Sequence, residues 1–303
     1  MRRRDFLAAP SFAAVASAAR PAGVLVDTHI HLFDPARFPY HANATYKPPA
    51  ATLDDYKKFV AQIKLDHTII VHPEPYQDDH SYLEYCFANE PRPGFFKGTC
   101  LFDPIDPKTP DRMGALAAKN KNRIVALRVH ANWKSGAPSV SGPIRDRDLR
   151  HRQMKITWTK ARVLGLAVQM HFIPRHAVAI GDLIRATEGV RVILDHLARA
   201  GEGTAAEYED VLKLARAGTV YMKYSGVRYS SRQEYPHDDV KPLIRRVYDA
   251  FGPERIIWGG LGHTAADFER QSAMLDSLFA FTTEAERAKI RGGNAMALFG
   301  FTT

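Results

Sequence analysis

Two histidines separated by a single residue form the most distinctive chemical motif of the chain. His29 and His31 directly follow a short apolar run that begins at Val24. Because alternate residues of a β-strand point to the same side, both imidazoles are expected to face one pocket while Ile30 turns away. Two imidazoles in one pocket can bind a metal ion, or can polarise a carbonyl group without one. Two satisfied surface histidines are the structural alternative.

Polar side chains also stand at the ends of several later apolar runs. They are Arg128 and His130, His171, His196, and Lys223 with the following Tyr229. A single histidine on a strand is usually structural. In a parallel barrel, however, the carboxyl ends of all strands meet on one face, where active sites form. The recurrence of polar groups at these ends therefore predicts a histidine-rich active site.

The elements that must position these residues alternate along the chain. Short β-branched runs predict strands, and their near-continuous apolar cores are typical of parallel strands covered on both faces. The predicted strands are Val24–Asp34, His67–Pro73, Phe95–Asp103, Arg123–Ala131, Gly165–Phe172, Arg191–Ala198, Thr219–Val227 and Arg255–Gly262. Between them, apolar residues at helical spacing predict helices. One begins after Thr52, and others cover Ser81–Asn89, Leu149–Leu164, Ala177–Thr187, Tyr208–Ala217, Val240–Phe251 and Ala265–Phe281.

This alternation, without a break in composition, predicts an α/β fold: a single-domain (β/α)₈ TIM barrel over residues 21–303. An open doubly wound sheet is the alternative, although no glycine-rich phosphate loop follows any strand. The proline-rich segment Phe33–Ala51 is too long for a minimal turn. It is expected to form the first loop on the substrate-binding face.

Residues 1–20 are interpreted as a leader peptide. Arg3-Arg4-Asp5-Phe6-Leu7 resembles a twin-arginine export motif, and a short alanine-rich stretch with a small-x-small cleavage pattern follows it. We therefore expect a periplasmic or otherwise exported protein. The alternative is an amphipathic or irregular N-terminus.

The composition limits the partners of the protein. The net charge is +9, but the basic residues are spread along the chain, which argues against a nucleic-acid partner and suits a small anionic substrate. No segment is apolar for long enough to span a membrane, so no membrane partner is expected after leader removal. Cys86 and Cys100 have no metal-site spacing, and two buried free thiols are expected. The oligomeric state is left open.

The sequence resembles the amidohydrolase-2 branch of the amidohydrolase superfamily, and within it the lactonases. The matching order and spacing extend over nearly the whole chain after the leader. The matching segments are residues 27–35, 38–40, 46–52, 192–196 and 223–226, with Asn294 and Gly300-Phe301 near the C-terminus.

The resemblance implies that His29, His31 and His196 surround a reacting carbonyl, with or without a divalent metal. It also implies a carboxylated lactone held by Arg128 and Tyr46. In the similar lactonases no metal takes part, so none is expected here. If a metal such as zinc is bound, its expected ligands are His29, His31, His171 and His196.

The chain departs from this family at the end of the eighth predicted strand. The family usually has an aspartate there, as general base, whereas this chain reads Trp258-Gly259-Gly260-Leu261-Gly262-His263. Leucine neither accepts a proton nor binds a metal. His263 could replace the missing base, or it could simply cap the following helix; Asp267 is a weaker candidate.

Three functions follow. The first is metal-independent hydrolysis of an anionic lactone, with His263 activating water and Arg128, Lys223 and Tyr46 holding the substrate; His130, His171 and Tyr229 are further substrate contacts. A lyase or isomerase acting on the same ligand is not distinguished from it. The second is a zinc-dependent hydrolase or decarboxylase. The third is a catalytically silent barrel that binds a small acid.

Overall fold

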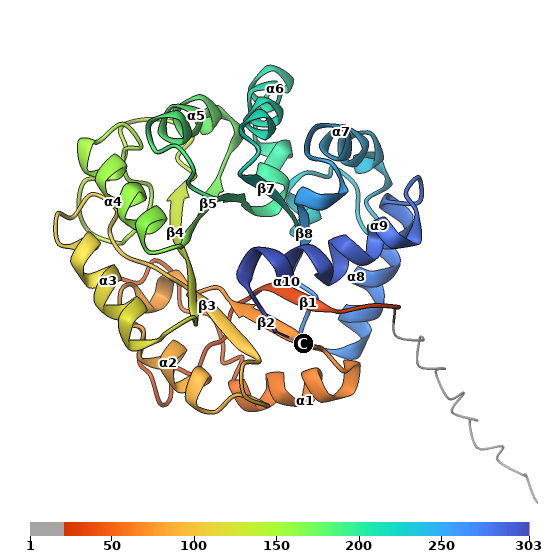
Figure 1. Cartoon of the computed structure of the whole chain (residues 1–303), viewed down its shortest axis with the longest axis horizontal. Coiled ribbons are helices and arrows are strands. Elements are labelled where there is room, and N and C mark those ends of the chain that lie inside the picture. Colours follow the sequence, from red (N-terminus) through yellow and green to blue (C-terminus); the bar gives the residue numbers. More distant parts are fainter. Residues whose placement is uncertain (1–20, 303) are drawn as a thin grey trace, which may run out of the picture.

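The computed structural model describes residues 21–302, so the predicted leader lies outside the described residues. The described chain forms one parallel sheet of eight strands in the order β1 to β8. The strands are β1 Val26–Ile30, β2 His67–Ile70, β3 Phe96–Cys100, β4 Ile124–Ala131, β5 Ala167–Phe172, β6 Val192–Leu194, β7 Val220–Tyr224 and β8 Ile256–Trp258. Helices surround the strands in chain order (Figure 1). The predicted (β/α)₈ barrel is confirmed, and the open doubly wound sheet is excluded.

Side chains join the first and last strands of this sheet. The Thr28 hydroxyl donates to the carbonyl oxygen of Trp258 at 2.6 Å. The buried Asp27 carboxylate accepts the backbone N–H groups of Gly260 at 2.8 Å and Leu261 at 3.2 Å. A Cβ atom on Gly259 would lie 2.7 Å from the Thr28 hydroxyl, so only glycine lets the two chains approach this closely. The motif that carries His29 therefore also closes the barrel.

The helices include three that were not expected from the sequence: α3, α9 and α10. The helices are α1 Leu53–Ile63, α2 Ser81–Ala88, α3 Thr109–Lys119, α4 Arg152–Val163, α5 Ala177–Ala186, α6 Ala205–Lys213, α7 Lys241–Phe251, α8 Ala265–Leu278, α9 Glu284–Ala288 and α10 Asn294–Phe299. Helix α3 buries only Thr109 and Met113, so it carries little apolar periodicity. None of the described helices is long and apolar enough to cross a membrane.

Helix α10 packs against one end of the barrel interior, and in Figure 1 it lies inside the ring of helices. Its Leu298 and Phe299 join an apolar cluster with residues from six strands, namely Val26, Ile69, Val125, Ala167, Ile193 and Ile257 among others. Lys97 donates to the carbonyl oxygens of Phe299 and Gly300, and Arg191 donates to that of Leu298. Helix α10 therefore covers part of this end, beside an open hollow of about 810 Å³ that carries no histidine, and the histidine-rich site lies at the other end.

The sixth predicted strand is wrong in its second half. Strand β6 ends at Leu194, and the next residues leave the extended conformation. Cys86 and Cys100 are both buried and free, as predicted.

Candidate active site

A cavity of about 310 Å³ opens among the carboxyl ends of the strands and the loops that follow them. Its lining residues are His31, Tyr46, Glu74, Arg128, His130, Asn132, Arg145, His171, His196 and Tyr229. Seven of these ten were predicted as site residues. The sequence-based prediction that the first long loop faces the substrate holds, since Tyr46 contributes to the wall.

The two histidines of the first strand form a hydrogen-bonded pair. The Nε2 atoms of His29 and His31 lie 3.3 Å apart, and Nδ1 of His31 lies 2.7 Å from the carbonyl oxygen of Val71. A carbonyl only accepts, so Nδ1 of His31 carries a proton, and a neutral His31 must accept at Nε2 from His29. Both nitrogens of His31 are then engaged. The pair shares one pocket as predicted, but His29 lies behind the cavity wall.

Asp195 is a buried hub beneath the cavity. Its carboxylate lies 3.1 Å from the Lys223 ammonium and 3.3 Å from the Arg128 guanidinium, and it also accepts from the Gln169 amide at 3.0 Å. Burial alone would raise the pKa of Asp195, but Lys223, His29 and Arg128 outweigh it and hold the pKa well below its usual range. The carboxylate is therefore charged and matched by two cations.

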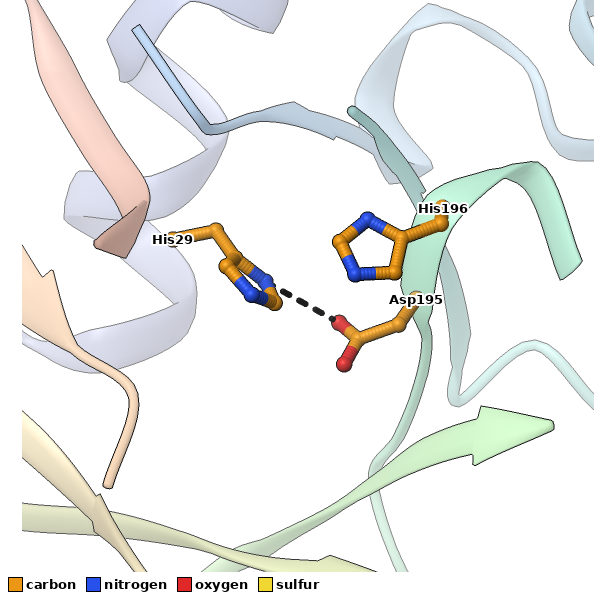
Figure 2. Close-up of side chains that lie close together, drawn as sticks. All are labelled: His29, Asp195 and His196. Atoms are coloured by element: carbon orange, nitrogen blue, oxygen red, sulfur yellow. Dashed lines mark ion pairs between the residues drawn. The ribbon is translucent and has the colours of Figure 1, made fainter. Parts of the chain in front are cut away.

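Figure 2 shows the His29 ring facing the Asp195 carboxylate, with His196 beside both. Nδ1 of His29 lies 3.7 Å from Oδ1 of Asp195. Nδ1 of His29 is buried and has no hydrogen-bond partner among the described residues, whereas Oδ1 of Asp195 faces the Lys223 ammonium at 3.1 Å. If His29 donates its Nε2 proton to His31, its Nδ1 presents a lone pair to the carboxylate, which explains the absence of a bond.

The chain after β6 forms one left-handed turn. His196, Leu197, Ala198 and Arg199 all have φ between 52° and 56°, although none is glycine. Such a turn costs about 1–2 kcal/mol per residue. Leu197 and Ala198 are buried, and the Tyr208 hydroxyl donates to the carbonyl oxygen of Leu197 at 3.0 Å. Packing therefore stabilises a strained backbone at the site.

The left-handed turn directs His196 and Arg199 toward the neighbouring strand ends. Nδ1 of His196 lies 2.8 Å from the Ser225 hydroxyl, and Nη1 of Arg199 donates to Nε2 of His171 at 3.0 Å. A Cβ atom on Gly226 would lie 2.8 Å from Nδ1 of His196, so glycine makes room for the ring. Among residues 21–302 the His196 ring makes its hydrogen bond through Nδ1, and the residue lines the cavity, which leaves Nε2 for a ligand.

Burial makes the imidazoles of the site uncharged near neutral pH. Burial and the neighbouring Arg128 lower the pKa of His31 to about 3, and burial lowers that of His196 to about 3 as well. The pKa values of His130 and His171 are also well below normal, first because of burial and then because of Arg128. The cations of this site are therefore arginine and lysine side chains and not histidines.

Three loops meet through Thr45 at the cavity wall. The Thr45 N–H donates to the Glu74 carboxylate at 3.3 Å, and Arg145 donates to the Thr45 hydroxyl at 3.1 Å. Tyr46 follows Thr45 and lines the cavity, with its side chain partly exposed. Burial raises the pKa of Tyr46, so its phenol is protonated and can donate a hydrogen bond.

Two predicted site residues lie elsewhere. His263 is exposed and packs beside Tyr56 of α1, and its backbone N–H donates to Asp267, which caps α8. Neither His263 nor Asp267 lines the cavity, so the structure gives no geometric support to either as the water-activating base. Lys223 is fully buried and binds Asp195 and the carbonyl oxygen of Thr28. It supports Asp195 and does not reach the substrate side.

Sequence reasoning missed Glu74, Asn132, Arg145 and the role of Asp195. The loop residues carry no strand-end pattern. Asp195 precedes His196 in the sequence, but the predicted strand extended to Ala198. In that strand Asp195 and His196 would point to opposite sides, so the sequence did not predict that Asp195 pairs with the charged residues of the site.

A metal ion could be held by three of these side chains. The ligand atoms of His29, Asp195 and His196 lie within 4.8 Å of one another. His31 and His171, which were expected as ligands, are engaged with Val71, His29 and Arg199. Imidazole nitrogens and a carboxylate oxygen are atom types that bind divalent ions. The local charge does not suit a further cation, because Lys223 and Arg128 already pair with the same carboxylate.

The eight-stranded barrel and a histidine-rich site at the carboxyl ends of its strands define an amidohydrolase-type enzyme. Residues 26–301 match the model of the Amidohydro_2 family, described as amidohydrolase, and the chain therefore belongs to that family. The predicted family resemblance is confirmed.

Relatives of known activity include lactone enzymes. The chain is 24% identical to 4-sulfomuconolactone hydrolase of Hydrogenophaga intermedia, over 90% of this chain and 88% of that protein. It is 27% identical to D-galactarolactone isomerase of Agrobacterium fabrum, over 77% of this chain and 74% of that protein. A probable 2-pyrone-4,6-dicarboxylic acid hydrolase of Acinetobacter baumannii shares the fold, with a TM-score of 0.73, 18% identity and coverage of 91% and 99% of the two chains.

Proposed function

We propose that this amidohydrolase opens a small carboxylated lactone by hydrolysis. The observation that carries the proposal is that Arg128 and Arg145 line the same small cavity as four uncharged imidazoles. Nε of Arg128 is buried and has no hydrogen-bond partner among the described residues, so it retains donor capacity for an anion. Guanidinium groups bind carboxylates by paired hydrogen bonds. The lactone relatives support the ester ring as the reacting group.

His196 is the group best placed to polarise the lactone carbonyl. When the Ser225 hydroxyl donates to its Nδ1, the neutral ring carries its proton at Nε2, the nitrogen left free. This N–H can donate to the oxygen that becomes negative as water adds. The water oxygen bonds to the carbonyl carbon, the ring C–O bond breaks, and the released alkoxide takes a proton. The product is a hydroxy acid.

The proton of the attacking water is proposed to pass to His130, which lines the cavity and whose Nε2 has no hydrogen-bond partner among the described residues. Leu261 is buried where the family aspartate would stand and accepts no proton. Asp27 accepts three backbone N–H groups, and Asp195 is neutralised by Lys223 and Arg128. Neither carboxylate lines the cavity, so neither is placed to take a proton from the attacking water.

A zinc-dependent hydrolase or decarboxylase is the second candidate. The buried Nδ1 of His29 favours it, since this atom has no hydrogen-bond partner among the described residues and lies 3.7 Å from Oδ1 of Asp195, so both could bind one cation. The two cations on Asp195 weigh against it, so no step of the proposed reaction is assigned to a metal. Elemental mass spectrometry of untagged protein purified without chelator separates the two. Near one equivalent of zinc would contradict the metal-independent proposal.

The proposal is tested with a matched pair of lactones, one carrying a carboxylate and one without it. Arg145→Met should lower kcat/KM for the carboxylated lactone by about 10- to 100-fold, as expected for the loss of a charge-assisted bond. It should leave the uncharged lactone nearly unchanged. Arg245→Met, on the exposed face of α7, is the control. Equal loss on both lactones would contradict carboxylate binding by Arg145.

A silent binding barrel remains distinguishable from an enzyme by one variant. His31→Ala should abolish turnover in the proposed enzyme, because it removes the partner of His29. In a silent barrel it would change ligand affinity alone.

We further propose that the protein is exported through its twin-arginine leader. The arginine pair and the small-x-small pattern before residue 20 support this. Fractionation of cells that express the chain with Arg3 and Arg4 replaced by lysine should retain the precursor in the cytoplasm; an unchanged distribution would contradict export by this route.

A further inference from the structure

We infer that Glu74 makes this site selective for lactones that carry hydroxyl groups as well as a carboxylate, that is, lactones of sugar diacids. The inference rests on the proposed function and names its substrate class. It concerns the side of the cavity formed by loops, away from the histidine cluster.

Glu74 is a buried carboxylate with unused acceptor capacity. It is 4% exposed and lines the cavity. Its Oε1 accepts from the Gln77 amide at 2.8 Å, and both oxygens share one long contact with the Thr45 N–H. No basic side chain among residues 21–302 forms an ion pair with it. An ionised carboxylate offers about four acceptor positions, so Oε2, whose one donor is the shared Thr45 N–H, can accept a further hydrogen bond.

A second wall residue has the same need. Asn132 also lines the cavity, and its buried Oδ1 has no hydrogen-bond partner among the described residues. Its amide nitrogen is already committed to the carbonyl oxygen of His171 at 3.2 Å. The wall therefore holds one unpaired acceptor, Oδ1 of Asn132, and one carboxylate with spare acceptor capacity, Glu74, and hydroxyl donors of a ligand would suit both.

Loop contacts fix Glu74 beside a cation. Thr45 donates through its N–H to Glu74 and accepts from Arg145 through its hydroxyl. The anion-binding Arg145 and the hydroxyl-accepting Glu74 are thus linked through one residue. A ligand that bears a carboxylate next to hydroxyl groups meets both demands at once.

The two kinds of lactone known among relatives make opposite demands on this wall. A lactone of a sugar diacid offers hydroxyl donors to Glu74 and Asn132 and one carboxylate to arginine. A flat unsaturated lactone with two carboxylates offers no hydroxyl donors. In one orientation its second carboxylate would also meet the negative charge of Glu74, which repels it.

The test compares D-galactarolactone with 2-pyrone-4,6-dicarboxylate in the wild type and in Glu74→Gln. The wild type should favour the sugar lactone by at least about tenfold in kcat/KM. Glu74→Gln removes the charge but keeps the shape, and should lower kcat/KM for the sugar lactone by about 10- to 100-fold. The pyrone should be unchanged or improved. Glu84→Gln, which loses only a helix-surface pair with Lys119, is the matched control.

Two results would overturn the inference. One is a wild-type preference for the pyrone; the other is an equal loss on both lactones, which would place Glu74 in the machinery common to both. Glu74→Asp, which keeps the charge, should retain the wild-type order of preference if the glutamine variant fails to fold.

Binding separates this inference from the proposed function. If neither lactone is opened, the proposed hydrolysis fails, but calorimetry with open-chain galactarate still decides the inference. Wild-type binding that Glu74→Gln weakens about tenfold upholds it. No galactarate binding, or binding that Glu74→Gln leaves unchanged, overturns it.

Discussion

The two ends of the barrel differ in what packs against the strands: apolar side chains at one end, and charged groups and imidazoles at the other. At the amino ends, α10 inserts Leu298 and Phe299 into the apolar interior, and basic side chains cap its last carbonyl groups. At the carboxyl ends, buried charges and imidazoles replace this apolar packing. Interactions at the first end lower the free energy of the folded state directly, whereas those at the second must balance one another to be tolerated.

The two ends also differ in how unusual backbone geometry is accommodated. Helix α10 follows a π-helical segment, Lys289–Gly293, in which Gly292 lies so close to the carbonyl oxygen of Val24 that a Cβ atom would approach it to 2.1 Å. Glycine relieves that contact. The left-handed turn after β6 has no glycine at residues 196–199 and is stabilised by packing around Leu197 and Ala198 and by the Tyr208 hydrogen bond. Strain is therefore concentrated where the chemistry lies, as expected for a functional site.

The largest expected effect comes from removing the charge of Asp195. Asp195→Asn leaves Lys223 and Arg128 buried without a counter-ion, and should destabilise the protein by about 3–5 kcal/mol. Urea unfolding measures this. Adding Lys223→Met to the variant should recover part of the loss, since one uncompensated charge is then gone. If the losses of the two single variants simply add in the double variant, the pairing of Asp195 with Lys223 is contradicted.

The next prediction separates chemistry from stability. His196→Asn should lower kcat by about 100- to 1,000-fold, as for the loss of one oxyanion donor. Its unfolding free energy should change little. Leu298→Ala should do the reverse, costing about 2–5 kcal/mol of stability while kcat of the folded enzyme is kept. Loss of kcat in Leu298→Ala under folding conditions would mean that the two ends are coupled.

Acidification should weaken the folded state through the buried imidazoles. The pKa of His31 is about 3 in the folded protein, and burial also lowers that of His80 to about 3. An unfolded chain binds protons at histidine below about pH 6.5, so stability is lost as pH falls from that value toward 3. Each such histidine should cost about 2 kcal/mol at pH 5. A melting temperature that is constant from pH 7 to 5 would contradict uncharged imidazoles.

Much of the fold was predictable because its signals are local. Apolar runs such as the one ending at Leu194 predict buried parallel strands, and the spacing of His29 and His31 predicts a shared pocket. The left-handed turn was not predictable, since positive φ is normally marked by glycine or asparagine, and residues 196–199 contain neither. It exists because tertiary packing overrides local preference.

The site was predictable where it sits on strands and not where it sits on loops. His130 and His171 are placed by strands β4 and β5. Glu74 and Arg145 reach the cavity through contacts with Thr45, which no local pattern encodes. Lys223 was assigned to the substrate because it shares the strand pattern, but it is fully buried and binds Asp195 and the Thr28 carbonyl oxygen.

The smallest predicted effect compares the same substitution at both ends. Ala198→Gly relieves left-handed strain of about 1–2 kcal/mol, which offsets the lost methyl group and the added chain entropy. Ala295→Gly, in α10, has no strain to relieve and should cost about 2 kcal/mol. Both alanines are fully buried. Thermal unfolding of the two variants should differ by about 1–2 kcal/mol; equal losses would contradict strain in the turn.

The most direct test of the central claim follows the oxygen of water. Chelator-treated protein is incubated with D-galactarolactone in ¹⁸O-labelled water, and the mass of the product is measured by mass spectrometry. Hydrolysis at the polar end of the barrel predicts an open-chain acid with one ¹⁸O in its new carboxylate, formed by the wild type and not by His196→Asn. An unlabelled isomer of the lactone, or no turnover without added metal, would contradict metal-independent hydrolysis.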